Sequence, residues 1–135
     1  MNDATENPVN QLNDDEAWEL LTRHEVGRLA TTAGGVLDIF PITYVVDNHS
    51  LVFRTAPGTK LVELTINDHV VFEIDHYDDV EGYSVVLHGK AEQLDSMGDV
   101  DYAKTLPLPS LFPTERPRYV RIHPERISAR RFTRE

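Results

Sequence analysis

The segment Arg54-Thr55-Ala56-Pro57-Gly58-Thr59-Lys60-Leu61 is the most informative part of this sequence. It joins the end of one predicted strand, residues 51–55, to the start of a predicted short helix, residues 58–66. The first N–H groups of a helix are unpaired and lie at its positive end, where a phosphate can bind. The cationic and hydroxyl side chains that could hold that phosphate are those of Arg54, Lys60, Thr55 and Thr59. From spacing alone, a phosphate site and an ordinary strand–turn–helix with solvent-facing cations are equally favoured. Neither of the glycine-loop patterns of nucleotide-binding proteins is present.

The strands before this segment indicate a barrel with an extra apolar face. Residues 26–32 and 36–46 are predicted strands joined by a hairpin at Gly34-Gly35. The strand 36–46 carries apolar side chains on both faces, so both faces should be covered. One face can line a barrel core, and the other needs a partner subunit or a ligand. Pro41 marks an edge, a bulge or a kink, because proline cannot donate a hydrogen bond to a sheet.

The pattern after the segment completes a mainly β fold with minor α. Further strands are expected at 51–55, 69–77, 83–94 and 118–132, the last interrupted at Pro124. Helices are expected at 13–24, where Asn13 and Glu16 form a capping-box pattern, at 58–66, and at 96–104, where Ser96 can act as the N-cap. The proline-rich stretch 105–117 should be irregular and should pack as a cover. About six short alternating strands, mostly connected by hairpins, predict an antiparallel barrel and not a parallel βαβ fold.

Length and composition limit the classes of function. A chain of 135 residues fits one domain, expected at 13–135, preceded by a flexible polar arm at 1–12. The net charge of −10 argues against general binding to nucleic acid or anionic membranes. Cysteine is absent, which excludes disulfides, thiolate metal sites and cysteine nucleophiles. No apolar run approaches the ~20 residues of a membrane helix and no signal-peptide pattern is present, so a cytoplasmic protein is expected.

Motifs for metal binding or hydrolysis are missing. The six histidines show no metal-ligand spacing, and no metal site is expected. Ser84 and Ser110 lack the setting of a hydrolase nucleophile. No residue pair is typical of a general acid and base, so the catalytic residues stay unassigned. This is compatible with a protein whose cofactor carries the chemistry.

Four segments, in this order and spacing, resemble the pyridoxamine-phosphate-oxidase-like flavin-binding family. They are Gly27–Thr32, Phe40–Asp47, Phe53–Leu61 and Gly82–Ala91, and Ile127–Phe132 is similar to the closing strand of that family. The resemblance covers about residues 13–133, and the arginine-to-lysine segment is its most specific part. Two positions depart from the pattern: Thr43 stands where many relatives carry Asn, and Tyr83 where many carry Trp.

The resemblance implies a six-stranded antiparallel split β-barrel of the FMN-binding type. It also implies a homodimer with two cofactor sites at the interface, each drawing on both chains. Arg54, Thr55, Thr59 and Lys60 would hold the cofactor phosphate. The backbone of Phe40, Pro41 and Ile42 would border the isoalloxazine ring, and Tyr83, Ser84 and Arg131 would approach from the partner chain.

The function implied is that of an FMN-dependent oxidoreductase, exchanging a hydride with a small substrate. A deazaflavin-dependent reductase is the alternative enzyme, since Arg118, Arg121, Arg130 and Arg131 could form a basic groove for its acidic tail. A non-catalytic flavin- or haem-binding protein is the alternative from another class. Haem would need an exposed axial ligand, for which His88 and His123 are the candidates. From its sequence position, we expect Arg131 to lie on the inward, interface face, paired with a ligand anion or a protein acid such as Glu73.

Overall fold

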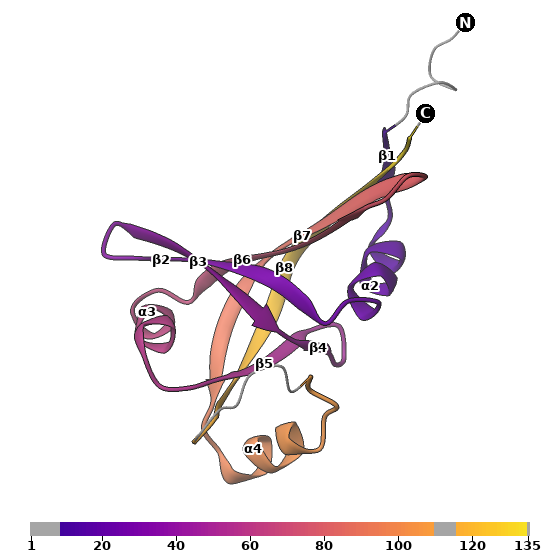
Figure 1. Ribbon diagram of the computed structural model, residues 1–135. Coiled ribbons are helices and arrows are strands. Elements are labelled where there is room, and N and C mark those ends of the chain that lie inside the picture. Colours follow the sequence, from indigo (N-terminus) through magenta and orange to yellow (C-terminus); the bar gives the residue numbers. More distant parts are fainter. Residues whose placement is uncertain (1–8, 110–115, 135) are drawn as a thin grey trace, which may run out of the picture.

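The computed structural model describes residues 9–109 and 116–134, which form one strongly curled antiparallel sheet with three helices around it (Figure 1). The strands are β1 (Val9–Leu12), β2 (Val26–Ala33), β3 (Val36–Thr43), β4 (Val45–Val46), β5 (Leu51–Thr55), β6 (His69–Tyr77), β7 (Glu81–Leu94) and β8 (Arg118–Thr133). The helices are α2 (Asp14–Thr22), α3 (Thr59–Ile66) and α4 (Met97–Lys104). No helix in the described ranges is long and apolar enough to cross a membrane.

The sheet has the strand order β3-β2-β6-β7-β8-β5-β4, and β1 pairs with β8 outside this path. One edge of β8 is shared, because β5 pairs with its first part and β1 with its last part. Its other edge pairs with β7 along nearly the whole strand. The curled sheet confirms the prediction of a mainly β antiparallel split barrel.

The described residues contain two more strands than the six predicted. The expected strand 36–46 is split into β3 and β4, because Tyr44 turns inward between them. Its side chain is 2% exposed, and its hydroxyl donates a hydrogen bond to the Leu21 carbonyl at 2.6 Å. The other additional strand is β1, whose residues were expected to end the flexible arm; they pair with Ala129–Phe132. The earlier part of that arm lies outside the described residues.

The helix termini follow the sequence closely. The Asn13 side chain accepts a hydrogen bond from the Glu16 amide at 2.8 Å, and the Glu16 carboxylate accepts one from the Asn13 amide at 3.1 Å. This is the predicted capping box, which satisfies two otherwise unpaired donors. Ser96 caps α4 by accepting from the Asp99 amide at 3.1 Å. The predicted start of α3 is confirmed within one residue, at Thr59.

The core fills the inside of the curl. Alternate residues of β6 point inward as predicted, and Val70, Phe72 and Ile74 are each at most 4% exposed. Helix α2 closes one end of the barrel with the buried side chains of Ala17, Trp18, Leu20 and Leu21. Burial of this apolar set is the main stabilising contribution to the fold.

Proline and glycine occupy positions that fit their geometry. Pro41 lies on β3, which is an edge strand, so its missing N–H leaves no sheet partner unsatisfied. Pro124 does not interrupt β8: Gly89 faces Pro124 and His88 faces Arg126, which leaves Glu125 as an extra residue in a β-bulge. The hairpin residues Gly34 and Gly35 have φ of 57° and 82°, a region that favours glycine. The predicted proline-rich cover is described only up to residue 109 and from residue 116.

Candidate functional site

The N-terminus of α3 lacks the groups that normally neutralise it. Strand β5 ends at Thr55, and the turn through Gly58 delivers the chain to the helix. No side chain caps α3, and its first turn contains no acidic residue. By contrast, α2 has a capping box and three acids in its first turn, and α4 has a serine cap and Asp99. The open amides of α3 therefore fit an anion supplied from outside the chain.

Lys60 places a cation beside this helix start. Its Nζ lies 5.2 Å from the centre of the Phe40 ring, over the ring, so α3 and β3 meet here. The side chain is half-buried, and burial lowers the pKa of Lys60. No ion pair joins Lys60 to an acid among residues 9–109 and 116–134. A half-buried ammonium without an acid partner would gain from a bound anion.

The other residues expected at the phosphate lie around the same turn. Arg54 is half-buried on β5, opposite Tyr119 of β8. Thr55 is buried, and its hydroxyl donates to the Ala56 carbonyl at 3.3 Å. Thr59 is exposed at the first position of α3. The local chain thus brings Arg54, Thr55, Thr59 and Lys60 to one strand–turn–helix junction, as their sequence spacing requires.

The β3 residues expected at the ring have different burial. Ile42 is 4% exposed and belongs to the core, whereas Phe40 is half-buried under Lys60. Pro41 points to the outer face of the sheet, opposite Arg28 of β2. The backbone of this strand has a free edge, since β3 pairs only with β2 in the described sheet. A planar ligand can therefore approach the edge next to Phe40.

Tyr83, Ser84 and Arg131 lie at the opposite end of the molecule from this junction. Tyr83 is paired with Arg131 on β8, whereas Arg54 is paired with Tyr119 on the same strand. Those two positions on β8 are 12 residues apart, which corresponds to roughly 40 Å of extended strand. Figure 1 shows the same separation, with α3 at one side and the start of β7 and the end of β8 far from it. One chain does not bring the two halves of the expected site together.

Tyr83 is held by two histidines that the sequence did not single out. The Tyr83 hydroxyl lies 2.6 Å from His24 Nε2, and the His76 ring lies 5.2 Å from the tyrosine ring. Burial, followed by the nearby His76, lowers the pKa of His24, and burial raises the pKa of Tyr83. Both shifts favour the neutral forms, so a neutral phenol and a neutral imidazole share this hydrogen bond. His24 thereby fixes the orientation of the tyrosine ring.

His76 is oriented in turn by an anion in the β6–β7 turn. Its Nε2 lies 2.9 Å from an Asp78 carboxylate oxygen. The same carboxylate accepts hydrogen bonds from the Val80 and Glu81 amides, each at 2.8 Å. The Glu81 amide, then the His76 side chain and the Val80 amide, lower the pKa of Asp78 to about 2. Asp78 therefore remains a carboxylate at neutral pH.

Arg131 has a different acid partner from the one considered in the sequence. Its Nε lies 3.1 Å from Glu81 Oε1, and its guanidinium lies 5.9 Å from the centre of the Tyr83 ring. Glu73 is bound by Arg28, at 2.5 Å and 3.0 Å, and Arg28 also binds Asp75 at 2.8 Å. The Arg131 Nε atom is buried and makes no hydrogen bond of good geometry, although its charge is paired.

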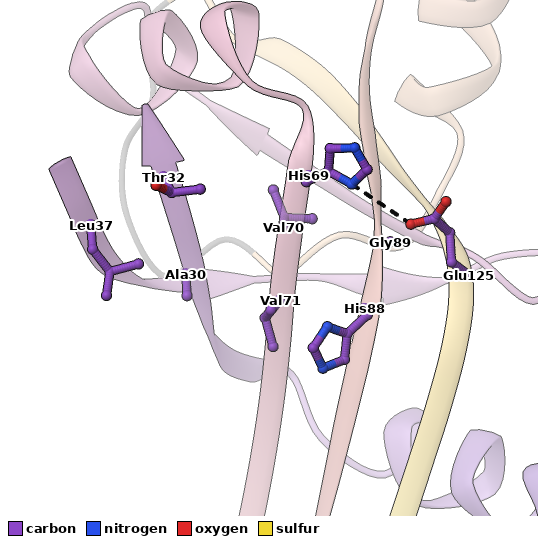
Figure 2. Close-up of a pocket in the computed structure, with 9 residues that line it drawn as sticks. All are labelled: Ala30, Thr32, Leu37, His69, Val70, Val71, His88, Gly89 and Glu125. Atoms are coloured by element: carbon purple, nitrogen blue, oxygen red, sulfur yellow. Dashed lines mark ion pairs between the residues drawn. The ribbon is translucent and has the colours of Figure 1, made fainter. Parts of the chain in front are cut away.

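The outer face of the sheet carries an apolar groove of about 180 Å³ (Figure 2). Its walls come from β2, β3, β6, β7 and β8 and include Ala30, Thr32, Leu37, Val71, His88 and Gly89. At one end His69 Nδ1 lies 3.8 Å from Glu125 Oε1, the bulged residue of β8. Beside the groove, Val36, Leu37 and Ile39 are 56%, 76% and 67% exposed. This is the second apolar face that the sequence predicts for residues 36–46.

The histidines form no metal centre in the described part of the chain, where no group of three or more potential ligands is found. His123 Nε2 pairs with Glu92 Oε1 at 2.8 Å, and His88 contacts the Arg126 guanidinium at 3.4 Å. Both residues named as possible haem ligands are thus engaged with neighbouring side chains.

Comparisons with known proteins identify the family of this chain. The family model described as pyridoxamine 5'-phosphate oxidase matches residues 13–131. The chain belongs to the pyridoxamine 5'-phosphate oxidase family. Its structure is similar to that of a putative pyridoxamine 5'-phosphate oxidase from Corynebacterium glutamicum, with 37% identity and a TM-score of 0.86 over 96% of this chain and 98% of the other.

Two further solved relatives are described as FAD-binding proteins. The one from Mycobacterium smegmatis is 40% identical, with a TM-score of 0.78 over 92% of this chain and 98% of the other. The one from Mesorhizobium loti is 26% identical, with a TM-score of 0.80 over 91% and 97%. These figures describe likeness over nearly the whole chain and not a single shared motif.

Within the pyridoxamine 5'-phosphate oxidase family, the tyrosine at position 83 now has a structural explanation. A tyrosine hydroxyl reaches His24 Nε2 and makes the hydrogen bond described above. The sequence offered no signal for this pair, because the two residues are 59 positions apart. The break at Tyr44 leaves Thr43, the other departure from the family pattern, as the last residue of β3.

Proposed function

We propose that this protein binds a flavin nucleotide, with a phosphate on the N-terminus of α3, and acts as a flavin-dependent oxidoreductase. The observation that carries the proposal is the uncapped, acid-free start of α3 beside the half-buried Lys60. Membership in the family and the two relatives described as FAD-binding give the anion its chemical class. The site residues are Arg54, Thr55, Thr59 and Lys60 for the phosphate and Phe40, Pro41 and Ile42 for the ring.

FMN is the proposed cofactor. The arginines that a deazaflavin tail would need are spread along β8, and two are paired with acids: Arg121 binds Asp47 at 3.1 Å and also Ser50 at 2.6 Å, and Arg131 pairs with Glu81. FAD is the competing ligand, because two relatives are described by that name. Its phosphates can use the same helix start, since the α3 amides recognise the phosphate group and not the rest of the nucleotide.

The functional unit is proposed to be a homodimer with two shared sites. Tyr83, Ser84 and Arg131 are about 40 Å of strand away from the phosphate residues of the same chain. A second copy can supply them where one chain cannot. The exposed apolar side chains of Val36, Leu37 and Ile39 favour such an interface, since a monomer rarely exposes a contiguous apolar face. An obligate dimer of this kind should bury about 2,000 Å² or more in total.

The flavin, when bound, supplies the redox chemistry. The residues of the chain bind and orient it: Lys60 and the α3 amides hold the anionic end, and Phe40 borders the ring. In the proposed dimer the partner's Tyr83 faces the site as a neutral phenol, because burial raises its pKa, and its hydroxyl is held by a hydrogen bond with His24. Its ring is thus presented in one orientation.

The proposal is tested first by binding. Flavin-free protein is titrated separately with FMN and FAD, following the quenching of flavin fluorescence, and the cofactor that co-purifies is identified by mass spectrometry. Saturable binding of a flavin with one site per chain supports the proposal. An absence of flavin binding contradicts the binding part, and a bound flavin that neither nicotinamide nucleotides nor any other small hydride donor can reduce contradicts the oxidoreductase part.

The shared site is tested by mixing two variants that bind flavin weakly. Lys60→Ala damages the phosphate half, and Arg131→Gln damages the partner half. In a mixed dimer one site carries both substitutions and the other carries none, so tight flavin binding returns to one site of each mixed dimer, about a quarter of all sites when the chains exchange freely. Sedimentation must show a dimer at micromolar concentration. If mixing restores nothing, each chain builds its site alone.

A further inference from the structure

Glu63 is a buried carboxyl group that the proposed flavin site does not use. It lies on α3 and is 7% exposed, and it accepts a hydrogen bond from the Thr31 hydroxyl at 2.5 Å. Thr31 itself is 1% exposed. No ion pair with a cation is formed by Glu63 in the described residues. A carboxylate buried in this way is costly, so its protonated form is favoured.

Asp38 provides a place for the proton. A hydrogen bond between the Asp38 and Glu63 side chains is the largest cause raising the pKa of Glu63, and burial raises it further. The Thr31 hydroxyl acts in the other direction and lowers that pKa. Two carboxyl groups form a hydrogen bond only while one of them carries a proton. The hydrogen bond between Glu63 and Asp38 therefore forms when one of the two carboxyl groups is protonated, and the two groups repel each other when both are charged.

This acid pair connects the two elements that form the proposed flavin site. Thr31 of β2 and Asp38 of β3 are paired residues on neighbouring strands. Glu63 of α3 therefore contacts both members of one cross-strand pair. Asp38 stands two residues before Phe40 on the same face of β3. Glu63 stands three residues after Lys60, on the neighbouring turn of α3. The contact between Lys60 and Phe40 and the acid pair thus join the same helix to the same strand.

We infer that Glu63 is a positioning residue, whose protonated pair with Asp38 holds α3 against β3 and so places the N-terminus of α3 beside Phe40. The carboxyl pair acts on the ligand only through the helix. The effect of Glu63 on flavin binding rests on the proposed function. Its contact between α3 and β3 does not depend on that function.

The direction of the pH effect follows from the proton count. Between the ordinary pKa of a glutamate and its raised value in the fold, the folded chain holds a proton that the unfolded chain has lost. Stability from this contact is therefore present at low pH and falls as pH rises through that window. The charged groups facing Glu63 are Asp38 on β3 and Lys60 one turn earlier on α3, while β2 contributes the neutral Thr31. Glu63→Gln leaves Lys60 unchanged, so the difference between that variant and the wild type reports the acid pair.

The test compares the wild type with Glu63→Gln, which is neutral at every pH, accepts from Thr31 and donates to Asp38. Melting temperature of the flavin-free protein and the Kd for FMN are both measured from about pH 5 to about pH 8.5, where a single coupled proton changes Kd at most tenfold per pH unit. Glu25→Gln is the matched control, because Glu25 is exposed and its side chain has no hydrogen bond or ion pair among the described residues. Asp38→Asn is the second variant and breaks the same proton sharing from the other side.

As pH rises, we expect the melting temperature of the wild type to fall relative to that of Glu63→Gln. Over the same range the Kd of the wild type for FMN should rise by about three- to tenfold relative to that variant. Asp38→Asn should also flatten the response, and Glu25→Gln should follow the wild type. Parallel curves for the wild type and Glu63→Gln, or weaker binding by Glu63→Gln at all pH values, overturn the inference. If neither the wild type nor any variant binds flavin, the proposed function is contradicted. The α3–β3 contact is still supported if the melting temperature of the wild type falls with rising pH relative to Glu63→Gln.

Discussion

Replacing Lys60 by alanine is the most direct test of the phosphate site. The substitution removes the Nζ group that lies over the Phe40 ring and leaves the backbone amides of α3 in place. A hydrogen bond to a charged group contributes about 1.5–3 kcal/mol, which corresponds to a Kd for FMN about 10- to 150-fold higher. Part of the affinity should survive, because the uncapped helix start still faces the anion.

The stability of the flavin-free protein should respond in the opposite way. Lys60 is half-buried, burial lowers its pKa, and it pairs with no acid in the described residues. Removing Lys60 removes the unfavourable free energy of burying its ammonium group. Lys60→Ala should therefore unfold at the same temperature as the wild type or slightly above it. A lower melting temperature would instead mean that the side chain is a structural contact of α3.

The pH dependence of FMN affinity is a second test of the role of Lys60. A bound phosphate restores the lysine pKa that burial has lowered, so the complex holds more protons than the free protein over the alkaline window between the two values. FMN affinity of the wild type should therefore fall as pH rises through that window. In Lys60→Ala this alkaline decline should disappear.

The assay is a fluorescence titration of flavin-free wild type, Lys60→Ala and Lys90→Ala. Lys90 is an exposed lysine on β7, outside the proposed site, and serves as the matched control. Equal affinity in all three proteins would refute the reasoning, because the phosphate would then lie elsewhere. An equal loss in both variants would assign the effect to overall charge.

Three further substitutions probe other parts of the molecule. Arg54→Ala should weaken FMN binding at least as much as Lys60→Ala, because a two-pronged phosphate contact is lost, and calorimetric titration measures it. Arg131→Gln should weaken flavin binding while changing flavin-free stability by less than about 1 kcal/mol, since its pair with Glu81 is over one-third exposed; a larger loss in thermal unfolding would assign it to an internal ion pair. Gly27→Ala should destabilise the fold by about 1–3 kcal/mol, because a Cβ there would lie 2.2 Å from the buried Phe72 ring and 2.8 Å from the Glu73 carbonyl; Gly98→Ala, whose Cβ would meet nothing within 4 Å, is the control in urea unfolding.

Local signals in the sequence carry much of the fold. The strand His69–Tyr77 was predicted with both ends correct, since its apolar alternation is regular and turns flank it. The caps at Asn13 and Ser96 were also predicted, because an N-cap depends on residues three positions apart. The break at Tyr44 was missed, since it depends on a hydrogen bond to Leu21 from another element. Strand β1 was missed for the same reason, as its partner is at the far end of the chain.

In the candidate site too, local features could be predicted from the sequence and contacts between distant residues could not. The junction from Arg54 to Lys60 is contiguous, so its convergence could be predicted from the sequence alone. The pairs His24–Tyr83 and Thr31–Glu63 join residues 59 and 32 positions apart, and neither end carries a recognisable motif. Arg131 was expected to pair with a ligand anion or with an acid such as Glu73; within the chain it pairs with Glu81, and Glu73 is bound by Arg28.

The place of β8 at the centre of the sheet has a consequence for how the protein folds. β8 is the last strand of the sequence, yet it pairs with β7 on one edge and with β5 and β1 on the other. Until residues 118–133 leave the ribosome, those three strands lack their common neighbour and keep open edges. Because most contacts of this sheet join distant parts of the chain, folding should be slow and should be completed only after residues 118–133 have been synthesised. Nascent chains stalled before Arg118 should therefore be protease-sensitive and dependent on chaperones, whereas chains that include β8 should gain resistance in a single cooperative step.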